Sequence, residues 1–485
     1  MTAVPMKIRA LYFLSLLAGT SVWFFSCRSP LWLDETVSYW EISGGFAQIR
    51  SRTIPGLSFP AYSYILFSFR ELFGNSEMVL RIPSVLAMLA AVFVLYRIAR
   101  NFLDYHMAIV TCLLFCLQKN VVFAAIDVRP YSFAVLATNL AVYALVLWLQ
   151  NPDLPLSILL GASCALIFYF HYLYAVILPA FVLCYVVSRA RFLRQDLRPI
   201  GIVVLSFLLA LSPVIPRLHY VFLHRNTYSF APTPHFKEFL LALLPSFAPF
   251  VLVAIVMVAL VLKKFRFPDA KTACALLFAL LLGAVPTAIL YFVSISTPMH
   301  IFLERYRLVG IVGLALFWGC LLALVRSEPL RLVVPLLVVP LTLFSCWRSP
   351  EFHQHGYSWK PALAYAQFIA ASDSAPLLIC SDLPQADFEP MPAVASESVL
   401  FAPLSYYKVT VPVVPLPRGL TADAERIGAA AMANYQREHR RFLVLTFGPS
   451  YPTARWFSDR AQGRFSTRLL GTFQGVAVVE FRPLD

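Results

Sequence analysis

Repeated apolar stretches, each long enough to approach the width of a lipid bilayer, dominate this chain. A helix needs about 20 mostly apolar residues to cross a hydrocarbon core roughly 30 Å thick. We predict about eleven such spans in the 485 residues, separated by short clusters of Lys and Arg. The spans lie near residues 9–27, 80–98, 107–124, 131–149, 156–170, 172–188, 200–216, 240–262, 272–293, 305–325 and 330–346. This pattern predicts a polytopic α-helical membrane protein.

The composition supports the same class. Hydrophobic residues make up 60% of the chain and charged residues only 13%, whereas a soluble domain has about 25% charged residues. The net charge of +14 is spread through loops beside apolar spans, so membrane lipids with anionic headgroups are expected partners and nucleic acid is not. The nine cysteines form no CxxC pair and fall mostly within apolar runs, which is typical of small core residues.

The distribution of basic residues predicts the orientation of the spans. Lys7 and Arg9 precede the first apolar stretch, and no small-residue cleavage site follows it, so we expect a retained anchor with a cytoplasmic N-terminus. Four of the five loops that this topology places inside are rich in Lys or Arg, the exception being 151–155. Eleven spans then put the C-terminus outside.

Composition changes after residue 346, where Asp, Glu, Gln, Gly and Pro return. Short β-rich runs at 377–380, 442–447 and 476–481 alternate with helical patterns near 359–371 and 421–438. We therefore predict a transmembrane domain over 1–346 and a small extracytoplasmic α/β domain over 347–485. The apolar aromatic segment 59–73, in the first outer loop, is expected to be a membrane-surface or re-entrant helix.

Two adjacent carboxylates, Asp34 and Glu35, follow the first span. Neighbouring residues on a helix point about 100° apart, so one carboxylate can face a cavity while the other meets a partner or a metal. A carboxylate that is partly withdrawn from water makes a usable general base. The alternative is that both residues stabilise the start of a helix by interacting with its dipole.

Arginines on the predicted outer side form the second candidate set. Asp127 and Arg129 come just before the fourth span, Arg81 opens the second, and Arg305 opens a late one. The planar guanidinium fork suits phosphate, and cations kept on the outer side against the usual bias suggest an anionic ligand there. In the alternative reading Asp127 and Arg129 neutralise each other, and each remaining arginine anchors its span at the interface.

Together these residues resemble the GT-C-type glycosyltransferases, in particular the bacterial branch related to protein O-mannosyltransferases and lipid A aminoarabinose transferases. The resemblance covers roughly residues 1–310 in order and spacing. It rests on Asp34-Glu35, Leu80-Arg81-Ile82-Pro83-Ser84, Asp127-Val128-Arg129-Pro130-Tyr131-Ser132 and Arg305-Tyr306.

The resemblance implies an inverting transfer, in the inner membrane of a bacterium, of a sugar from a polyprenyl-phosphate donor to an outer glycan, lipid or protein acceptor. Asp34 would act as the base, and Glu35 and Asp127 would orient the acceptor or hold a cation. The residues implied to bind the donor phosphate are Arg81, Arg129, Tyr131, Arg305 and Tyr306.

The sequence departs from the family pattern at one place. Many relatives carry His-Pro-Pro-aromatic before the re-entrant helix, whereas this chain reads Ser58-Phe59-Pro60-Ala61-Tyr62. A role for that histidine in binding a metal or the acceptor therefore does not carry over. Whether a divalent cation serves as a cofactor is left open.

Two other function classes fit a many-span chain with buried charges. A transporter or lipid flippase is the main alternative, but no internal repeat is found, and the charges gather at the outer boundary instead of mid-membrane. A non-catalytic scaffold whose outer domain binds a partner would leave the acidic and basic motifs unexplained. An interfacial enzyme accounts for the motifs best.

Overall fold

The computed structural model describes residues 6–54, 58–224, 231–244, 248–348, 357–381, 383, 398–416, 422–447 and 452–484. Contacts divide the chain into two compact units. The helical unit comprises residues 1–27 and 81–353, and the mixed unit comprises residues 28–80 and 354–485. Residues 28–80, the first long outer loop, thus group with the C-terminal residues. The domains predicted with a boundary at residue 346 did not include this long-range association.

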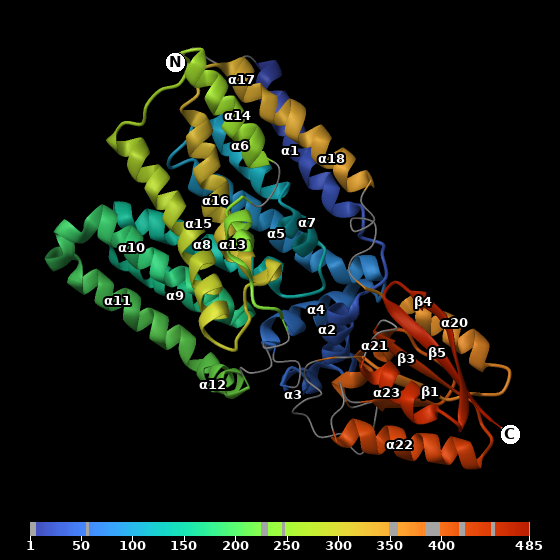
Figure 1. Cartoon of the computed structure of the whole chain (residues 1–485). Coiled ribbons are helices and arrows are strands. Elements are labelled where there is room, and N and C mark those ends of the chain that lie inside the picture. The colour runs from blue at the N-terminus through green and yellow to red at the C-terminus, as the bar shows by residue number, and fades with distance from the viewer. Residues whose placement is uncertain are drawn as a thin grey trace. The chain divides into compact units, whose positions relative to one another are not determined.

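Apolar helices joined by short turns form the helical unit (Figure 1). Its helices are α1 (Met6–Ser21), α5 (Glu77–Ala99, in this unit from Arg81 on), α6 (Tyr105–Cys116), α7 (Lys119–Ala125), α8 (Tyr131–Gln150), α9 (Leu154–Phe170), α10 (Leu178–Arg189), α11 (Leu193–Leu211), α12 (Ile215–Leu223), α13 (Phe236–Ala242), α14 (Ala248–Val261), α15 (Ala270–Ser296), α16 (Glu304–Ala323), α17 (Glu328–Val333) and α18 (Val339–Arg348).

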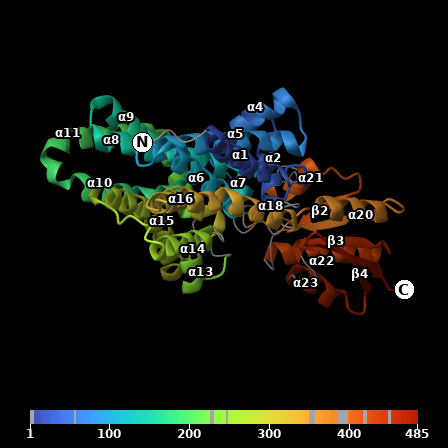
Figure 2. The ribbon, with the colours of Figure 1, turned by 90° about the horizontal axis from the view of Figure 1, so that it is seen from above.

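The predicted class of polytopic helical membrane protein is confirmed, but the count of eleven spans is not. Among the described residues, six helices are long and apolar enough to cross a membrane, or seven if the bent pair α6 and α7 is one span. That pair, predicted as one straight span over 107–124, bends by 75°. The stretch from 172 to 223 is helical almost throughout, yet Figures 1 and 2 show α10 and α11 as separate rods that meet at one end.

Close contact between α15 and α16 fixes the position of α16. A Cβ atom added at Gly310 would lie 2.7 Å from the backbone oxygen of Gly283, and one added at Gly313 would overlap the backbone around Gly283. Only residues without side chains let two helix backbones approach this closely, as is common between membrane helices. The first turn of α16 is thereby held in place.

Loops predicted to be cytoplasmic meet at one end of the helical unit. Phe265 and Val325, from two of these loops, form an antiparallel β-bridge. Arg331, from the second of them, lies 4.0 Å from the carboxylate of Asp104 in a third predicted cytoplasmic loop. Three of the loops that the Lys and Arg clusters assign to one side therefore contact one another in the fold.

A five-stranded sheet forms the centre of the mixed unit, in the order β2-β1-β3-β5-β4. Its strands are β1 (Leu377–Cys380), β2 (Val413–Leu416), β3 (Phe442–Phe447), β4 (Phe465–Phe473) and β5 (Val476–Pro483). β1 runs parallel to β2 and β3, whereas β5 is antiparallel to β3 and β4. The predicted runs 377–380 and 442–447 are strands with those bounds, and the α/β class of this part is confirmed.

Helices cover both faces of this sheet. Leu377 and Ile379 point to the face covered by α20 (Lys360–Ala370), and Leu378 and Cys380 point to the opposite face. This alternation follows from the period of two along a strand. Packed on the second face are α22 (Ala422–Arg437) and α23 (Pro452–Ala461), which contribute aromatic residues such as Trp456.

The residues after the first span belong to this unit through a core of their own. They form α2 (Leu33–Ser43), α3 (Ile49–Arg52) and α4 (Pro60–Phe73). Val37 and Trp40 of α2 pack against Val399, Leu400 and Ala402 at the start of α21 (Ala402–Tyr406). The segment predicted as a surface or re-entrant helix is helical as α4, and its relation to the membrane stays a prediction.

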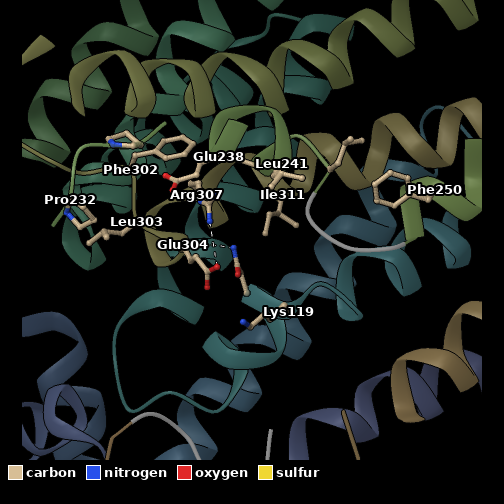
Figure 3. Close-up of a pocket in the computed structure, with 14 residues that line it drawn as sticks. Lys119, Pro232, Glu238, Leu241, Phe250, Phe302, Leu303, Glu304, Arg307 and Ile311 are labelled. Carbon is tan, nitrogen blue, oxygen red and sulfur yellow. Dashed lines mark hydrogen bonds and ion pairs between the residues drawn. The ribbon is translucent and has the colours of Figure 1, made fainter. Parts of the chain in front are cut away.

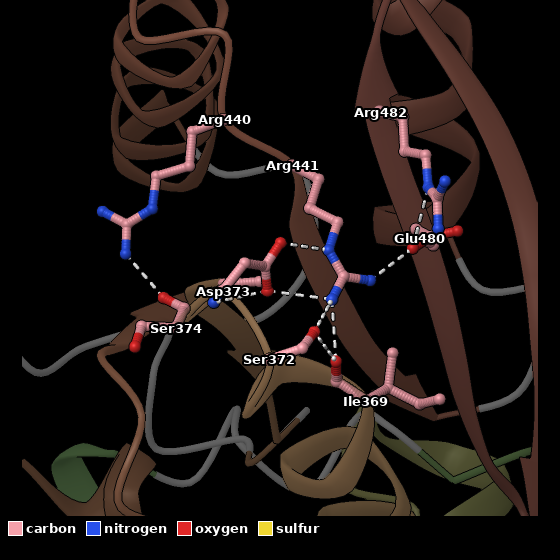
Figure 4. A network of polar contacts seen from close by, with 9 residues as sticks. Ile369, Ser372, Asp373, Ser374, Arg440, Arg441, Glu480 and Arg482 are labelled. Atoms are coloured by element: carbon pink, nitrogen blue, oxygen red, sulfur yellow. Dashed lines mark hydrogen bonds and ion pairs between the residues drawn. The ribbon is translucent and has the colours of Figure 1, made fainter.

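Arg441 ties the end of α20 to the sheet (Figure 4). Its guanidinium contacts Asp373 at 2.5 Å and Glu480 at 2.7 Å, and it donates to the carbonyl oxygen of Ile369 at 2.7 Å. The Arg441 side chain is 14% exposed and that of Glu480 only 4% exposed. A charge buried this far needs such partners, because its desolvation is otherwise uncompensated.

We expect the Arg441→Ala variant to loosen this end of the mixed unit. Losing a buried charged hydrogen-bond donor costs about 1.5–3 kcal/mol, so amide hydrogen exchange in β3 and β5 of the full-length protein should speed up. The matched control is Arg440→Ala, because among the described residues the Arg440 side chain donates to the Ser374 carbonyl and lies 4.0 Å from Glu438. Equal exchange in the two variants would contradict this role for Arg441.

The ion pair between Arg441 and Asp373 makes the stability of the mixed unit depend on pH in the acid range. Its hydrogen bond with Arg441 holds the pKa of Asp373 below its usual value. A carboxylate whose pKa is lowered by folding contributes stability above its unfolded pKa of about 3.9, and this is lost as pH falls through the folded value. The protection of β3 and β5 amides, relative to their intrinsic exchange at the same pH, should therefore fall in the wild type below about pH 4, and less so in Arg441→Ala.

Candidate functional site

Asp34 and Glu35 occupy the first turn of α2 and have different surroundings. Glu35 is fully buried, and its carboxylate accepts a hydrogen bond from the backbone N–H of Trp32 at 3.1 Å. This is the returning half of a capping box. Asp34 is half-buried and points about 100° away from Glu35. The capping role that the sequence left open for both residues is thus seen for Glu35, and the role of Asp34 as a base stays a prediction.

Ser58, which begins the stretch where the sequence departs from the family pattern, contacts α2 through Glu41. Glu41, two turns after Asp34, is 1% exposed. Its carboxylate accepts hydrogen bonds from the hydroxyls of Ser58 and, at 2.6 Å, of Ser63. A buried carboxylate needs such donors. Ser58 and Ser63 thereby tie the entry and first turn of α4 to α2.

Arg129 lies in a turn between α7 and α8 that is held at both ends. Asp127, at the start of this turn, is fully buried, and its backbone oxygen accepts a 2.6 Å hydrogen bond from the Ser84 hydroxyl. Ser132, in the first turn of α8, donates its hydroxyl to the backbone oxygen of Ala124 at 2.7 Å. Arg129 itself is partly exposed. The sequence Asp-Val-Arg-Pro-Tyr-Ser therefore forms a fixed turn that presents one arginine.

An aromatic cage surrounds His171, the residue that ends α9. Its ring centroid lies 5.5 Å from that of Tyr131, 5.1 Å from Tyr306, 5.4 Å from Tyr174 and 5.8 Å from Tyr172. Among the described residues its Nδ1 atom is buried and has no hydrogen-bond partner. These tyrosines come from separate parts of the chain, so His171 lies where α8, α9 and α16 meet.

The segments that contain the predicted Arg129 and Arg305 both reach this histidine, because Tyr131 and Tyr306 pack against its ring. The Tyr174 hydroxyl donates to the backbone oxygen of Arg305 at 2.7 Å, and the Arg305 guanidinium lies over the Tyr306 ring at 5.4 Å. Burial first, and then the charges of Arg129 and Arg305, lower the pKa of His171 to about 3. The ring is therefore neutral at physiological pH.

Arg81 has a different environment. Its guanidinium is fully buried and donates to the backbone oxygens of Cys27, at 2.9 Å, and Ser26, at 3.4 Å. These oxygens lie just after the first helical stretch, where carbonyl groups lack intrahelical partners. The structure thus gives Arg81 a role in fixing this chain segment, and its contact with a phosphate stays a prediction.

Sequence reasoning did not select His171. The residue falls between the predicted spans 156–170 and 172–188, within Phe168-Tyr169-Phe170-His171-Tyr172-Leu173-Tyr174. A lone histidine among aromatic residues at the junction of two spans was the available signal. As for a cation, no group of three or more His, Cys, Asp or Glu residues in the described part of the chain could hold a metal ion.

Residues 55–220 match the family model for dolichyl-phosphate-mannose-protein mannosyltransferase. This stretch includes Arg81, Asp127, Arg129 and His171. No curated protein sequence matches the chain.

Solved structures give matches along the whole chain. ArnT from Cupriavidus metallidurans bound to undecaprenyl phosphate superposes with a TM-score of 0.58 at 14% identity, covering 98% of both chains. The apo state of the same protein gives a TM-score of 0.56, with the same identity and coverage. The oligosaccharyltransferase AglB from Archaeoglobus fulgidus gives 0.46 at 10% identity, covering 96% of this chain and 69% of that one, which is too weak to support a conclusion.

Proposed function

We propose that this chain, which has the fold of the GT-C-type membrane glycosyltransferases related to ArnT, transfers a sugar from a polyprenyl-phosphate carrier to an acceptor outside the membrane. The family resemblance drawn from its motifs is confirmed at the level of the fold by the ArnT superposition and by the mannosyltransferase match. One fold hosts many activities, so the activity has to be argued from the residues.

The observation that carries the proposal is that Tyr131 and Tyr306 both pack against His171, at 5.5 and 5.1 Å between ring centroids, so the segments that contain Arg129 and Arg305 meet there. Guanidinium binds phosphate through paired hydrogen bonds. The phosphate of a lipid-linked sugar is such a group, and it leaves with more negative charge as the sugar departs. Donors that are already in place stabilise that developing charge most.

His171 is proposed to orient the donor instead of carrying a charge. Its neutral ring has one nitrogen that donates and one that accepts a hydrogen bond. Because Nδ1 is buried without a described partner, a ligand oxygen or hydroxyl would complete its hydrogen bonding. The surrounding tyrosines, Tyr131 and Tyr306 among them, would pack against a sugar or an isoprene unit.

Asp34 is proposed as the general base. It would take the proton of the acceptor hydroxyl while the acceptor oxygen forms a bond to the anomeric carbon and the bond to the phosphate oxygen breaks. Attack from the side opposite the leaving phosphate inverts the configuration at that carbon. Glu35, which caps α2, is proposed to hold Asp34 in position, and the buried Asp127 to hold the Arg129 turn.

A lipid flippase is the alternative class. It would need no general base, and the purified protein would translocate a lipid without moving a sugar from the carrier to an acceptor. Mass spectrometry of cell-envelope glycans and glycolipids from cells with and without the gene tests the proposal. Loss of one sugar from an envelope acceptor supports transfer, and an unchanged set of glycans contradicts it.

The proposed orientation places the N-terminus in the cytoplasm and the chain from residue 347 on the outer side. We expect reporter fusions after Asp104, Arg194 and Lys264 to report cytoplasm, because these loops hold the basic clusters. A fusion at Asp485 should report the outer side. A cytoplasmic signal at Asp485 would overturn the topology, with the three internal fusions serving as controls for expression.

A further inference from the structure

A cavity of about 650 Å³ in the helical unit is not used by the proposed chemistry. Its lining comes from α7, α13, α14 and α16, together with the segment before α13 (Figure 3). Four charged side chains line it, two basic and two acidic, and they are Lys119, Glu238, Glu304 and Arg307. An apolar wall that includes Leu241, Phe250 and Ile311 completes it. Such a lining suits an amphiphile.

The cavity lies on a different face of α16 from Arg305. Leu303, Arg307 and Ile311 all line it, and residues four apart share one face of a helix. Arg305 comes two residues before Arg307, so the two side chains point about 200° apart. Arg305 lies over the Tyr306 ring, which packs against His171, whereas Arg307 faces the cavity (Figure 3). The two arginines therefore serve different places.

Arg307 is the deepest charged group in the lining. Its side chain is 17% exposed and packs over the Phe302 ring at 4.9 Å. Its ion pair with Glu304 is loose, at 3.7 Å, and among the described residues its buried Nε has no hydrogen-bond partner. A buried donor of a charged group is costly to leave unpaired. An anionic oxygen entering the cavity would satisfy it.

The acidic residues decide which anion fits. Glu238, Lys119 and Glu304 are exposed at the cavity, so the four charged groups sum formally to zero. A dianion would meet two carboxylates, whereas a head group with one negative and one positive charge would meet a partner for each. We propose that the cavity binds a zwitterionic phospholipid of the membrane, with its phosphate at Arg307 and its ammonium at Glu238 and Glu304.

Lipid binding to the purified, delipidated full-length protein tests this proposal. The probes are short-chain phosphatidylethanolamine, phosphatidylglycerol, which lacks the ammonium, and free phosphoethanolamine, which lacks the chains. Native mass spectrometry should show phosphatidylethanolamine bound about tenfold more tightly than phosphatidylglycerol, the scale of one charged hydrogen bond. Equal binding of the two lipids, or equally tight binding of phosphoethanolamine, would refute the assignment.

Variants localise the site. Arg307→Ala should weaken the binding of both lipids by about tenfold or more. Glu238→Gln should abolish only the preference for phosphatidylethanolamine, and folding should tolerate this change because Glu238 is exposed. Lys237→Ala changes the neighbouring residue outside the lining and should bind like the wild type. Unchanged lipid binding in Arg307→Ala and Glu238→Gln would contradict the proposal. Displacement of the bound phospholipid by polyprenyl phosphate would also contradict it, because the cavity would then belong to the donor. Neither result depends on sugar transfer.

Discussion

Asp34→Asn should lower sugar transfer by about 10²- to 10⁴-fold, the usual cost of losing a general base. The change keeps the size of the side chain and removes only the carboxylate charge in the first turn of α2, which costs about 0.3–1 kcal/mol of stability. The measurement is transfer by purified protein at matched folded amounts, with wild-type and Asp34→Ala proteins alongside. A purely structural role predicts that Asn works nearly as well as Asp and that Ala is worse than both.

The neighbouring carboxylate supplies the matched control. Glu35→Gln should fold and keep most of the activity, because a glutamine can still accept the hydrogen bond from the Trp32 amide. If Asp34→Asn transfers sugar like the wild type, Asp34 is not the base, whatever happens at Glu35. If both variants lose activity and both remain folded, the division of roles between the two carboxylates is wrong.

Arg129→Ala should weaken use of the lipid-phosphate donor by roughly 10- to 150-fold, which corresponds to about 1.5–3 kcal/mol for a charged hydrogen bond. Arg129→Lys should recover only part of this loss, because an ammonium group cannot form the paired geometry of the guanidinium fork. The measurement is the dependence of the transfer rate on donor concentration. Arg305→Ala should behave alike, since the segments of both arginines meet at His171 through Tyr131 and Tyr306.

Arg97→Ala is the control for these substitutions. Arg97 also contacts a tyrosine, because it donates to the Tyr143 hydroxyl at 3.2 Å and its guanidinium lies 5.8 Å from that ring. Arg97 lies in the last turn of α5, beside a predicted cytoplasmic loop. Its loss should leave donor use unchanged. If Arg129→Ala and Arg97→Ala have the same donor dependence as the wild type, the phosphate site is elsewhere.

Local pattern was sufficient to predict the helical class of the first part of the chain and two central strands of the sheet. Strands β1 and β3 have the bounds predicted from their apolar residues, because a buried strand needs little beyond a short apolar run between turn signals. Strand β2 contains Pro415 and was not predicted, yet it lies at the edge of the sheet, where a proline is tolerated. Gly471 interrupts the pattern of β4 at an irregularity in its pairing with β5.

Span length alone could not reveal the break between α6 and α7. The stretch 107–124 is apolar enough to read as one span, and only Gln118-Lys119-Asn120 marks the bend of 75°. Likewise, no local pattern indicates that α2 packs against α21, since that contact joins residues more than 350 positions apart. Both features depend on tertiary packing, which overrides what a sequence window can show.

The candidate site was predicted in part. Arg129 and Arg305 were selected because cations on the predicted outer side are unusual, and Tyr131 and Tyr306 from the same segments pack against His171, whereas the phosphate-binding role of the arginines stays a prediction. The distinction between Asp34 and Glu35 could not be predicted, since both carboxylates suit the start of a helix and only the geometry shows which one accepts the Trp32 amide. Arg307 was equally hidden, because its role depends on which face of α16 meets a cavity.

The central claim is that the sugar donor is a polyprenyl phosphate, and one measurement tests it most directly. Purified full-length protein would be mixed with a membrane extract of its source cells, which supplies the acceptor. Two donors would be compared: a polyprenyl-phosphate lipid fraction from cells grown on radiolabelled glucose, and radiolabelled nucleotide sugars. We predict that label moves from the lipid fraction to an acceptor, that the nucleotide sugars give none, and that Asp34→Asn abolishes the transfer. Transfer from a nucleotide sugar, or equal transfer by wild type and Asp34→Asn, would contradict the account.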